Sequence, residues 1–243
     1  MLKIQITGRD VLLLKDIYEN SFLSFYQIHE VHFAGRARPT VYNRLSKMAQ
    51  AGLIETMNVN LFVHHRNNES VGVIYRVTKR GVELLNNFTQ GVPISASISG
   101  LNLSSLYHDL LLTDVLRAFK KRLPEYSIVS SKSNSCAWNK KERIPDAILF
   151  QPEDKIKWAL ELELTAKSEL RYRDIILSYR TSPEFEKVLY VVKDESIQQK
   201  MGGLITGYNG HYTEGDDTDK FVFYGLANLL NNQQQEKINE IQN

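Results

Sequence analysis

The sequence has little of several features that mark particular protein classes. Its 243 residues include a single cysteine, Cys136, so no internal disulfide can form and a cysteine-rich zinc site is excluded. No apolar run approaches the roughly 20 residues that span a bilayer. The first residues, MLKIQITGRD, lack the apolar segment of a secretory signal. We therefore expect a cytoplasmic protein that does not insert into a membrane.

The net charge is also small, but positive and negative residues are distributed unevenly along the chain. The net charge is +2, which excludes a polycation. Residues 1–90 hold 11 Lys and Arg against 7 Asp and Glu, a balance of +4, so the remainder carries about −2. The N-terminal part is therefore the better candidate for binding an anionic partner.

A stretch rich in Gly, Ser and Pro divides the chain. Residues 91–104 lie in this stretch, which is almost uncharged, and we interpret them as a linker between modules at 1–90 and 105–230. Residues 231–243 are rich in Asn and Gln, which predicts a flexible tail.

The first module shows the start and stop signals of several helices. Thr7 and Asp10 are spaced as a capping box, and Ser24 and Gln27 form a second one. Pro39 suits the first turn of a third helix that Gly52 ends. Two strand-like segments with a polar tip and one more helix follow. Three helices, a two-stranded wing and a final helix resemble a winged helix-turn-helix, in which the third helix enters the major groove.

The predicted third helix has two faces. Val41, Leu45 and Met48 have the spacing of a buried stripe. The polar residues near this helix and at the tip of the wing offer donors and acceptors for bases and phosphates. The candidate DNA-binding residues are Arg38, Thr40, Asn43, Arg44, Lys47 and Arg66. Two alternatives stay open: the basic side chains solvate an exposed helix, or the module docks a protein.

The second module mixes helices and strands. We expect a helix over 105–122, strands over 126–130, 144–150 and 157–164, a helix over 168–179, and a buried strand over 188–192. A helix near 196–201, a strand over 221–224 and a short final helix complete it. In the helix over 168–179 we expect Leu170, Ile175, Ile176 and Tyr179 to be buried. The fold class is therefore α/β (α+β), with a mixed sheet flanked by helices.

A predicted hairpin gathers three carboxylates. If Glu153 and Asp154 form its loop, Asp146 lies opposite Glu161, and Glu163 shares the face of Glu161 about 7 Å along the strand. Carboxylates this close repel one another unless a cation lies between them, and oxygen ligands suit Mg²⁺ or Mn²⁺. Asp114 on the preceding helix is a further candidate ligand. The alternatives are a solvated strand face for the three carboxylates and a hydrogen-bonded structural Asp114.

Pro145-Asp146, the hairpin and Glu161-Leu162-Glu163 resemble the PD-(D/E)xK fold of restriction-type nucleases. The resemblance implies that Asp146 and Glu161 bind the metal. Glu163 stands where that family usually has Lys, and it would be a further ligand or orient the attacking water. Lys167 would supply the missing positive charge, or it is a solvated cation at a helix end.

Taken whole, the chain resembles the replication-relaxation family, and within it the MobC-type plasmid mobilization relaxases of the MOB-C class. The resemblance implies metal-dependent nicking of one strand of double-stranded DNA at a plasmid transfer origin, in the bacterial cytoplasm. It also implies relaxosome accessory proteins and a type IV coupling protein as partners, and it leaves a homodimer open. Two alternatives remain: a non-catalytic DNA-binding accessory or transcriptional regulator with an inactive nuclease fold, and a general endonuclease.

Overall fold

The computed structural model describes residues 4–63, 69–88, 103–131, 143–151, 153, 156–208 and 217–231. The chain forms two compact units, Met1–Leu110 and Leu111–Asn243. The division falls inside a helix, and Gln27 donates to the carbonyl of Leu110, the last residue of the same first unit, at 2.9 Å. Residues 91–102 of the predicted linker and 232–243 of the predicted tail lie outside the described residues.

The first unit begins with three helices whose ends follow the local sequence signals. They are α1 (Gly8–Glu19), α2 (Phe25–His32) and α3 (Arg38–Gln50), with the short strand β1 (Leu23–Ser24) before α2. Both predicted capping boxes are present, at the start of α1 and of α2. Gly52 follows α3 with a φ of +71°, a left-handed conformation that favours glycine, so the predicted stop of this helix is confirmed.

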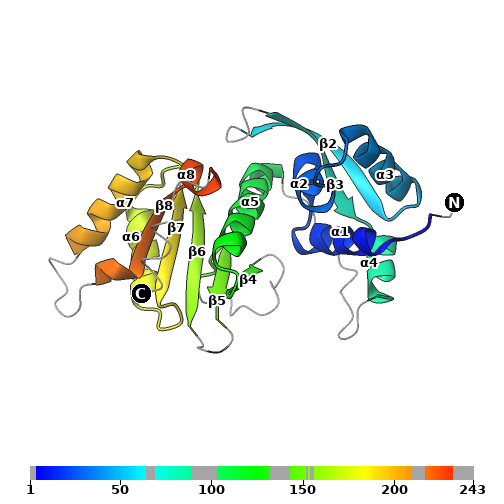
Figure 1. Cartoon of the computed structure of the whole chain (residues 1–243). Coiled ribbons are helices and arrows are strands. Elements are labelled where there is room, and N and C mark those ends of the chain that lie inside the picture. Colours follow the sequence, from blue (N-terminus) through cyan, green and yellow to red (C-terminus); the bar gives the residue numbers. More distant parts are fainter. Residues whose placement is uncertain are drawn as a thin grey trace. The chain divides into compact units, whose positions relative to one another are not determined.

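A β-hairpin and a fourth helix complete the first unit (Figure 1). β2 (Ile54–Val63) pairs antiparallel with β3 (Glu69–Val77), and β1 adds to the other edge of β3. α4 (Lys79–Asn86) follows directly. The order of the four helices and the two hairpin strands is the one predicted from the sequence, whereas β1 was not predicted. Val41, Leu45 and Met48 of α3 are buried in the core of this unit, as predicted.

The second unit is built on one five-stranded sheet in the order β4-β5-β6-β7-β8. β4 (Ser127–Ser130), β5 (Ala147–Phe150) and β6 (Lys157–Glu163) are antiparallel, whereas β7 (Lys187–Val192) and β8 (Phe221–Gly225) run parallel to β6. The helices are α5 (Leu106–Arg122), whose first turn belongs to the first unit, α6 (Glu169–Arg180), α7 (Glu195–Tyr208) and α8 (Leu226–Leu230). Two short 3₁₀ turns, η2 (Leu103–Ser105) and η3 (Asp217–Lys220), precede α5 and β8. The predicted mixed sheet flanked by helices is confirmed.

The helices cover both faces of this sheet (Figure 1). Tyr179 of α6 and Met201 of α7 belong to one core cluster with Ala159 and Tyr190 of the sheet. On the opposite face, Phe119 of α5 makes an edge-to-face contact with Tyr224 of β8, with ring centroids 5.4 Å apart. Buried on both sides, β7 is the continuous apolar strand that the sequence predicted.

Two details of the second unit differ from expectation. Leu170 was expected to be buried, but it is 71% exposed, and Tyr172 occupies the inward position near the start of α6. α7 continues through Gly202 and Gly203 to Tyr208, whereas the sequence predicted a helix only near 196–201. Burial of Met201 and Ile205 on the sheet stabilises the helix beyond the two glycines. Of the helices in the described ranges, none combines the length and apolar character needed to cross a bilayer.

Gly81 in α4 generates a stability prediction. A Cβ atom at this position would lie 2.2 Å from the carbonyl oxygen of Leu53 and 2.6 Å from Val77. We expect Gly81→Ala to lower the free energy of unfolding by about 1–3 kcal/mol, because α4 would have to move away from the main chain after α3. Denaturant unfolding measures this. Gly72→Ala is the matched control because nothing lies within 4 Å of its added Cβ, and equal stability of the two variants would contradict the packing described.

Candidate functional site

The predicted hairpin register is the register observed. Ala147 pairs with Leu160, so the next residue outward on each strand brings Asp146 opposite Glu161. Glu161 and Glu163 alternate with Leu162 along β6 and therefore share a face. That face is the one covered by α6, because Tyr179 of α6 donates a hydrogen bond to Glu161. Glu161 and Glu163 are 8% and 4% exposed, which excludes a solvated strand face.

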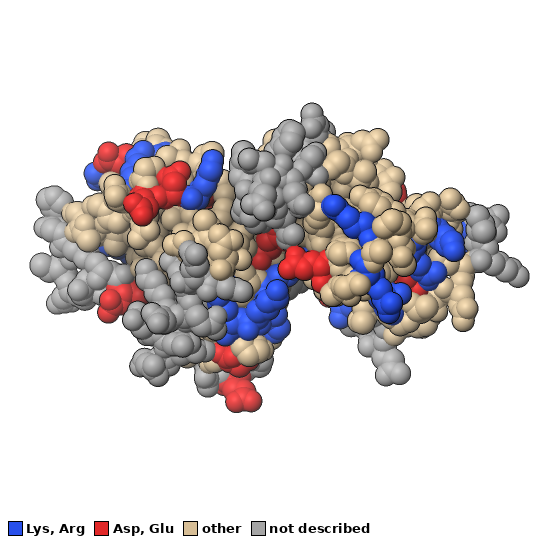
Figure 2. Space-filling model, turned by 45° about the horizontal axis from the view of Figure 1, so that its top comes forward, with Lys and Arg blue, Asp and Glu red and all other residues tan. Residues whose placement is uncertain are grey.

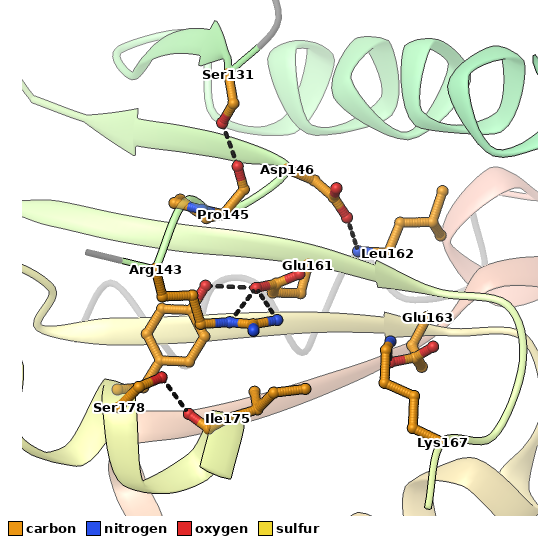
Figure 3. A network of polar contacts seen from close by, with 11 residues as sticks. Ser131, Arg143, Pro145, Asp146, Glu161, Leu162, Glu163, Lys167, Ile175 and Ser178 are labelled. Carbon is orange, nitrogen blue, oxygen red and sulfur yellow. Dashed lines mark hydrogen bonds and ion pairs between the residues drawn. The ribbon is translucent and has the colours of Figure 1, made fainter. Parts of the chain in front are cut away.

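Glu161 is held by three donors on a single oxygen atom (Figure 3). Arg143 lies just before β5, and two nitrogens of its guanidinium lie 3.0 and 2.9 Å from Oε1 of Glu161. The hydroxyl of Tyr179 donates to the same oxygen, and the guanidinium carbon lies 5.4 Å from the centroid of the Tyr179 ring. Burial raises the pKa of Glu161; Arg143 opposes this, the nearby Asp146 carboxylate adds to it, and the net pKa lies above its ordinary value.

The other two carboxylates also have protein partners (Figure 3). Asp146 accepts a hydrogen bond from the backbone amide of Leu162 at 2.8 Å. Glu163 forms an ion pair with Lys167, four residues further along the chain. The backbone amide of Lys167 donates to the hydroxyl of Tyr172 at 3.0 Å, which fixes the chain at this point. Lys167 is therefore a partner of Glu163 here and not a solvated cation.

These carboxylates as they stand do not fit a divalent cation. Their chemistry is suitable, since all three offer oxygen atoms. Their orientation is not, because each side chain is turned to its own donor: Arg143 for Glu161, Lys167 for Glu163 and the amide of Leu162 for Asp146. Within the described residues, no group of three or more His, Cys, Asp and Glu side chains is arranged to hold a metal ion.

The structure does not bring Asp114 to this group. Asp114 is buried on α5, and Phe119 of the same helix packs on Tyr224. The strand registers put Tyr224 on the same face as Leu162, opposite Glu161. The sheet therefore lies between Asp114 and Glu161.

Arg143 was missed by the sequence reasoning. It stands three residues before Asp146, in the segment that leads into β5. Its closeness in sequence to a predicted acidic residue could have marked Arg143 as part of the site. Its partner Glu161, however, is 18 positions away in sequence and comes near only through the hairpin.

On α3, three of the predicted DNA-binding residues form an exposed polar face. Thr40, Asn43 and Lys47 are exposed and lie opposite the buried stripe. Figure 2 shows Lys and Arg side chains spread over the visible face of the first unit, with few Asp or Glu among them. Arg66 lies outside the described residues. This face has the donors and acceptors suited to a nucleic acid.

Arg44 is turned away from that face. Its Nε donates to Oδ1 of Asp10 at 2.9 Å, and a terminal nitrogen donates to the carbonyl of Gln5 at 2.8 Å. Asp10 is fully buried and also caps α1 through Thr7. Burial opposes ionisation of Asp10, but the hydrogen bonds from Arg44 and Thr7 outweigh it, and the pKa of Asp10 lies below its ordinary value. Arg44 therefore ties α3 to α1 and is not available to read bases.

The sequence reasoning also overlooked an aromatic cluster beside Arg38. The Arg38 guanidinium lies 4.9 Å from the ring centroid of Tyr26 and 5.7 Å from that of Phe25. Tyr42 stacks on Phe25 at 4.0 Å and is 47% exposed. The signal was present, since Arg38 and Tyr42 are four residues apart on one helix. Arg38 is thus an exposed cation whose orientation is set by stacking.

A family model described as Replication-relaxation matches residues 14–183. The matched region is more than half of the chain and includes α3, the β5–β6 hairpin, Arg143 and the three carboxylates. No curated protein and no solved structure matches the chain.

The contact between Arg44 and Asp10 predicts a stability effect. We expect Arg44→Ala to lower the free energy of unfolding by about 3 kcal/mol, because it leaves the buried Asp10 carboxylate without its charged partner. Lys47→Ala on the exposed face should change stability by less than about 0.5 kcal/mol. Chemical denaturation of both variants checks this, and an Arg44→Ala protein as stable as Lys47→Ala would be inconsistent with a structural role.

Proposed function

Because the chain belongs to the replication-relaxation family, we propose that it acts on plasmid DNA, in replication or in relaxation of the plasmid. In this proposal the first unit binds double-stranded DNA at a plasmid origin as a winged helix-turn-helix. The second unit nicks one strand there, as MobC-type relaxases do at a transfer origin.

The observation that carries the nicking proposal is the position of the carboxylates in the topology of the second unit. A helix, three antiparallel strands, a helix and a parallel strand follow one another from α5 to β7. This is the core order of the PD-(D/E)xK fold that the sequence resembles. Asp146 precedes β5, and Glu161 and Glu163 lie on its neighbour β6, where that resemblance expects the acidic residues.

The proposed roles follow the chemistry of each side chain. Asp146 and Glu161 form the acidic centre, and Glu163 orients the attacking water. Lys167 stabilises the negative charge that develops on the phosphate. A requirement for Mg²⁺ or Mn²⁺ belongs to this proposal as an expectation. Relaxosome accessory proteins and a type IV coupling protein are the partners proposed with it.

A second function is favoured by a specific observation. All three carboxylates are paired with donors of the protein, two of them with cations. In this alternative the carboxylates stay in these pairs and the protein binds DNA without cutting it. The protein would then be a non-catalytic accessory of the relaxosome or a transcriptional regulator.

DNA binding by α3 gives a prediction that applies to both functions. We expect Lys47→Ala to weaken binding to all duplex sequences alike and to reduce the salt dependence of binding by about one released counterion. Asn43→Ala should instead reduce discrimination between the origin and an unrelated duplex. Fluorescence anisotropy over a salt series measures both. Lys15→Ala removes an equal charge from the exposed Lys15–Glu19 pair of α1 and is the control. If Lys15→Ala weakened binding as much as Lys47→Ala does, α3 would be excluded as the specific contact.

Nicking is tested on supercoiled plasmid with and without the cognate origin. We expect conversion to open circles only with the origin, only with Mg²⁺ or Mn²⁺, and not with chelator. Asp146→Ala and Glu161→Ala should abolish nicking and leave DNA affinity within a few-fold. Glu169→Gln is the matched control, because Glu169 pairs with Arg173 on the exposed surface of α6.

The possible results separate the alternatives. Normal nicking by either alanine variant would disprove the acidic centre. Binding without cutting under every metal condition would leave the non-catalytic function. Cutting of plasmids that lack the origin would indicate a general endonuclease.

A further inference from the structure

A row of aromatic rings runs along one side of α2. Phe25 and His29 are one helical turn apart, and their rings stack with centroids 5.8 Å apart. Phe33 comes four residues later, directly after the helix, and is buried. The row therefore extends from the start of α2 to the turn that leads into α3.

Two exposed arginines cover the two ends of this row. The guanidinium carbon of Arg9, at the start of α1, lies 4.5 Å from the ring centroid of Phe33. At the other end, the guanidinium carbon of Arg38 lies 5.7 Å from the ring centroid of Phe25 and 4.9 Å from that of Tyr26. A guanidinium that stacks on a ring has its N–H donors at its edge, where a ligand can reach them.

A third exposed arginine, Arg36, belongs to the turn between α2 and α3. Its backbone amide donates to the carbonyl of Phe33 at 2.9 Å, and Nε2 of His29 donates to its carbonyl at 2.7 Å. Gly35 precedes it with a φ of +73°, a conformation that favours glycine. The main chain of Arg36 is thus fastened to the aromatic row at two points.

Arg9, Arg36 and Arg38 form a cluster of positive charge, which we call the arginine cluster. Like charges held close together favour an anionic partner. The carboxylate next to Arg9 in sequence, Asp10, is neutralised by Arg44. The first and last rings of the row are eight residues apart, so they lie on the order of 12 Å from each other. A DNA strand carries a phosphate about every 3.4 Å of helix axis, so the cluster can contact more than one phosphate.

We propose that the arginine cluster binds phosphates of one strand of the duplex and so positions α3, whose exposed face reads the bases. A guanidinium binds a phosphate through two N–H groups. The rings hold the guanidinium planes of Arg9 and Arg38 in place before binding, which reduces the entropy lost when DNA binds. Contacts to phosphates are the same on every sequence. This inference rests on the proposed DNA binding by the first unit, and it gives Arg9 and Arg36 a role there.

The salt dependence of DNA binding by the full chain tests the cluster. Fluorescence anisotropy is measured over a salt series with two duplexes of equal length, one of which contains the plasmid origin. We expect Arg9→Gln and Arg36→Gln each to weaken binding to both duplexes alike by roughly fivefold, and to reduce the slope of log K against log salt by about 0.9. Lys15→Gln removes an exposed charge from the same helix as Arg9 and should bind as the wild type does.

The contribution of the rings is tested with the charges kept. Tyr26→Leu removes the ring nearest to Arg38, and we expect it to weaken binding about two- to fivefold without a change in the salt slope. Arg38→Lys keeps the charge but loses the planar group, and it should behave in the same way. Thermal melting without DNA shows that each variant is folded at the temperature of the titration. Wild-type affinity in both variants would exclude a role for the rings.

The outcomes separate this inference from the proposed function. If Arg9→Gln and Arg36→Gln bind as the wild type does while Lys47→Ala binds more weakly, the arginine cluster is disproved and binding through α3 stands. If the wild type binds neither duplex, DNA binding and the role of the cluster fail together. If the glutamine variants lose discrimination between the duplexes, the arginines read bases and the phosphate assignment is overturned. Equal weakening on both duplexes with a lower salt slope supports it.

Discussion

The second unit depends on the neutralisation of Glu161. This carboxylate projects from a buried strand toward α6, where an unpaired charge would destabilise the sheet by several kcal/mol. Arg143 supplies the opposite charge, and the Tyr179 hydroxyl completes the contact. The segment before β5, the middle of β6 and α6 are therefore held to one another at a polar point inside an apolar layer. An enzyme and a binding protein would both need this buried charge to be neutralised.

Each of the two units buries a carboxylate and neutralises it with an arginine. In the first unit, Asp10 is buried and answered by Arg44; in the second, Glu161 is buried and answered by Arg143. Each pair joins elements that are distant in sequence and so fixes a geometry that apolar packing alone would leave less specific. In the first unit the ion pair orients the exposed face of α3. In the second it sits among the residues proposed to act on DNA.

Predictions from the sequence were correct where a feature depends on residues close together along the chain. Two capping boxes located the starts of α1 and α2, Gly52 located the end of α3, and the predicted register of the β5–β6 hairpin matched the observed register to the residue. Alternation along β6 then brought Glu161 and Glu163 to one face. These features depend on residues within a few positions of one another, so spacing alone determined them.

The failures at Arg44, Arg143 and α7 involve contacts that spacing along the sequence does not reveal. Helical periodicity put Arg44 on the polar face, but only the folded unit shows that Asp10 lies within its reach. Arg143 became part of the site through a contact across the hairpin, and α7 continued past two glycines because the sheet beneath it buries Ile205. For the acidic centre, the sequence predicted which carboxylates come close but not which cations accompany them.

The tie between Arg44 and Asp10 has an evolutionary consequence for target choice. Because Asp10 also caps α1, a change at Arg44 would disturb both helices at once, whereas Thr40, Asn43 and Lys47 contribute no side chain to the buried core. If α3 reads the origin as proposed, a change of target at these three residues would leave the Arg–Asp tie in place. Such a change would then cost little fold stability.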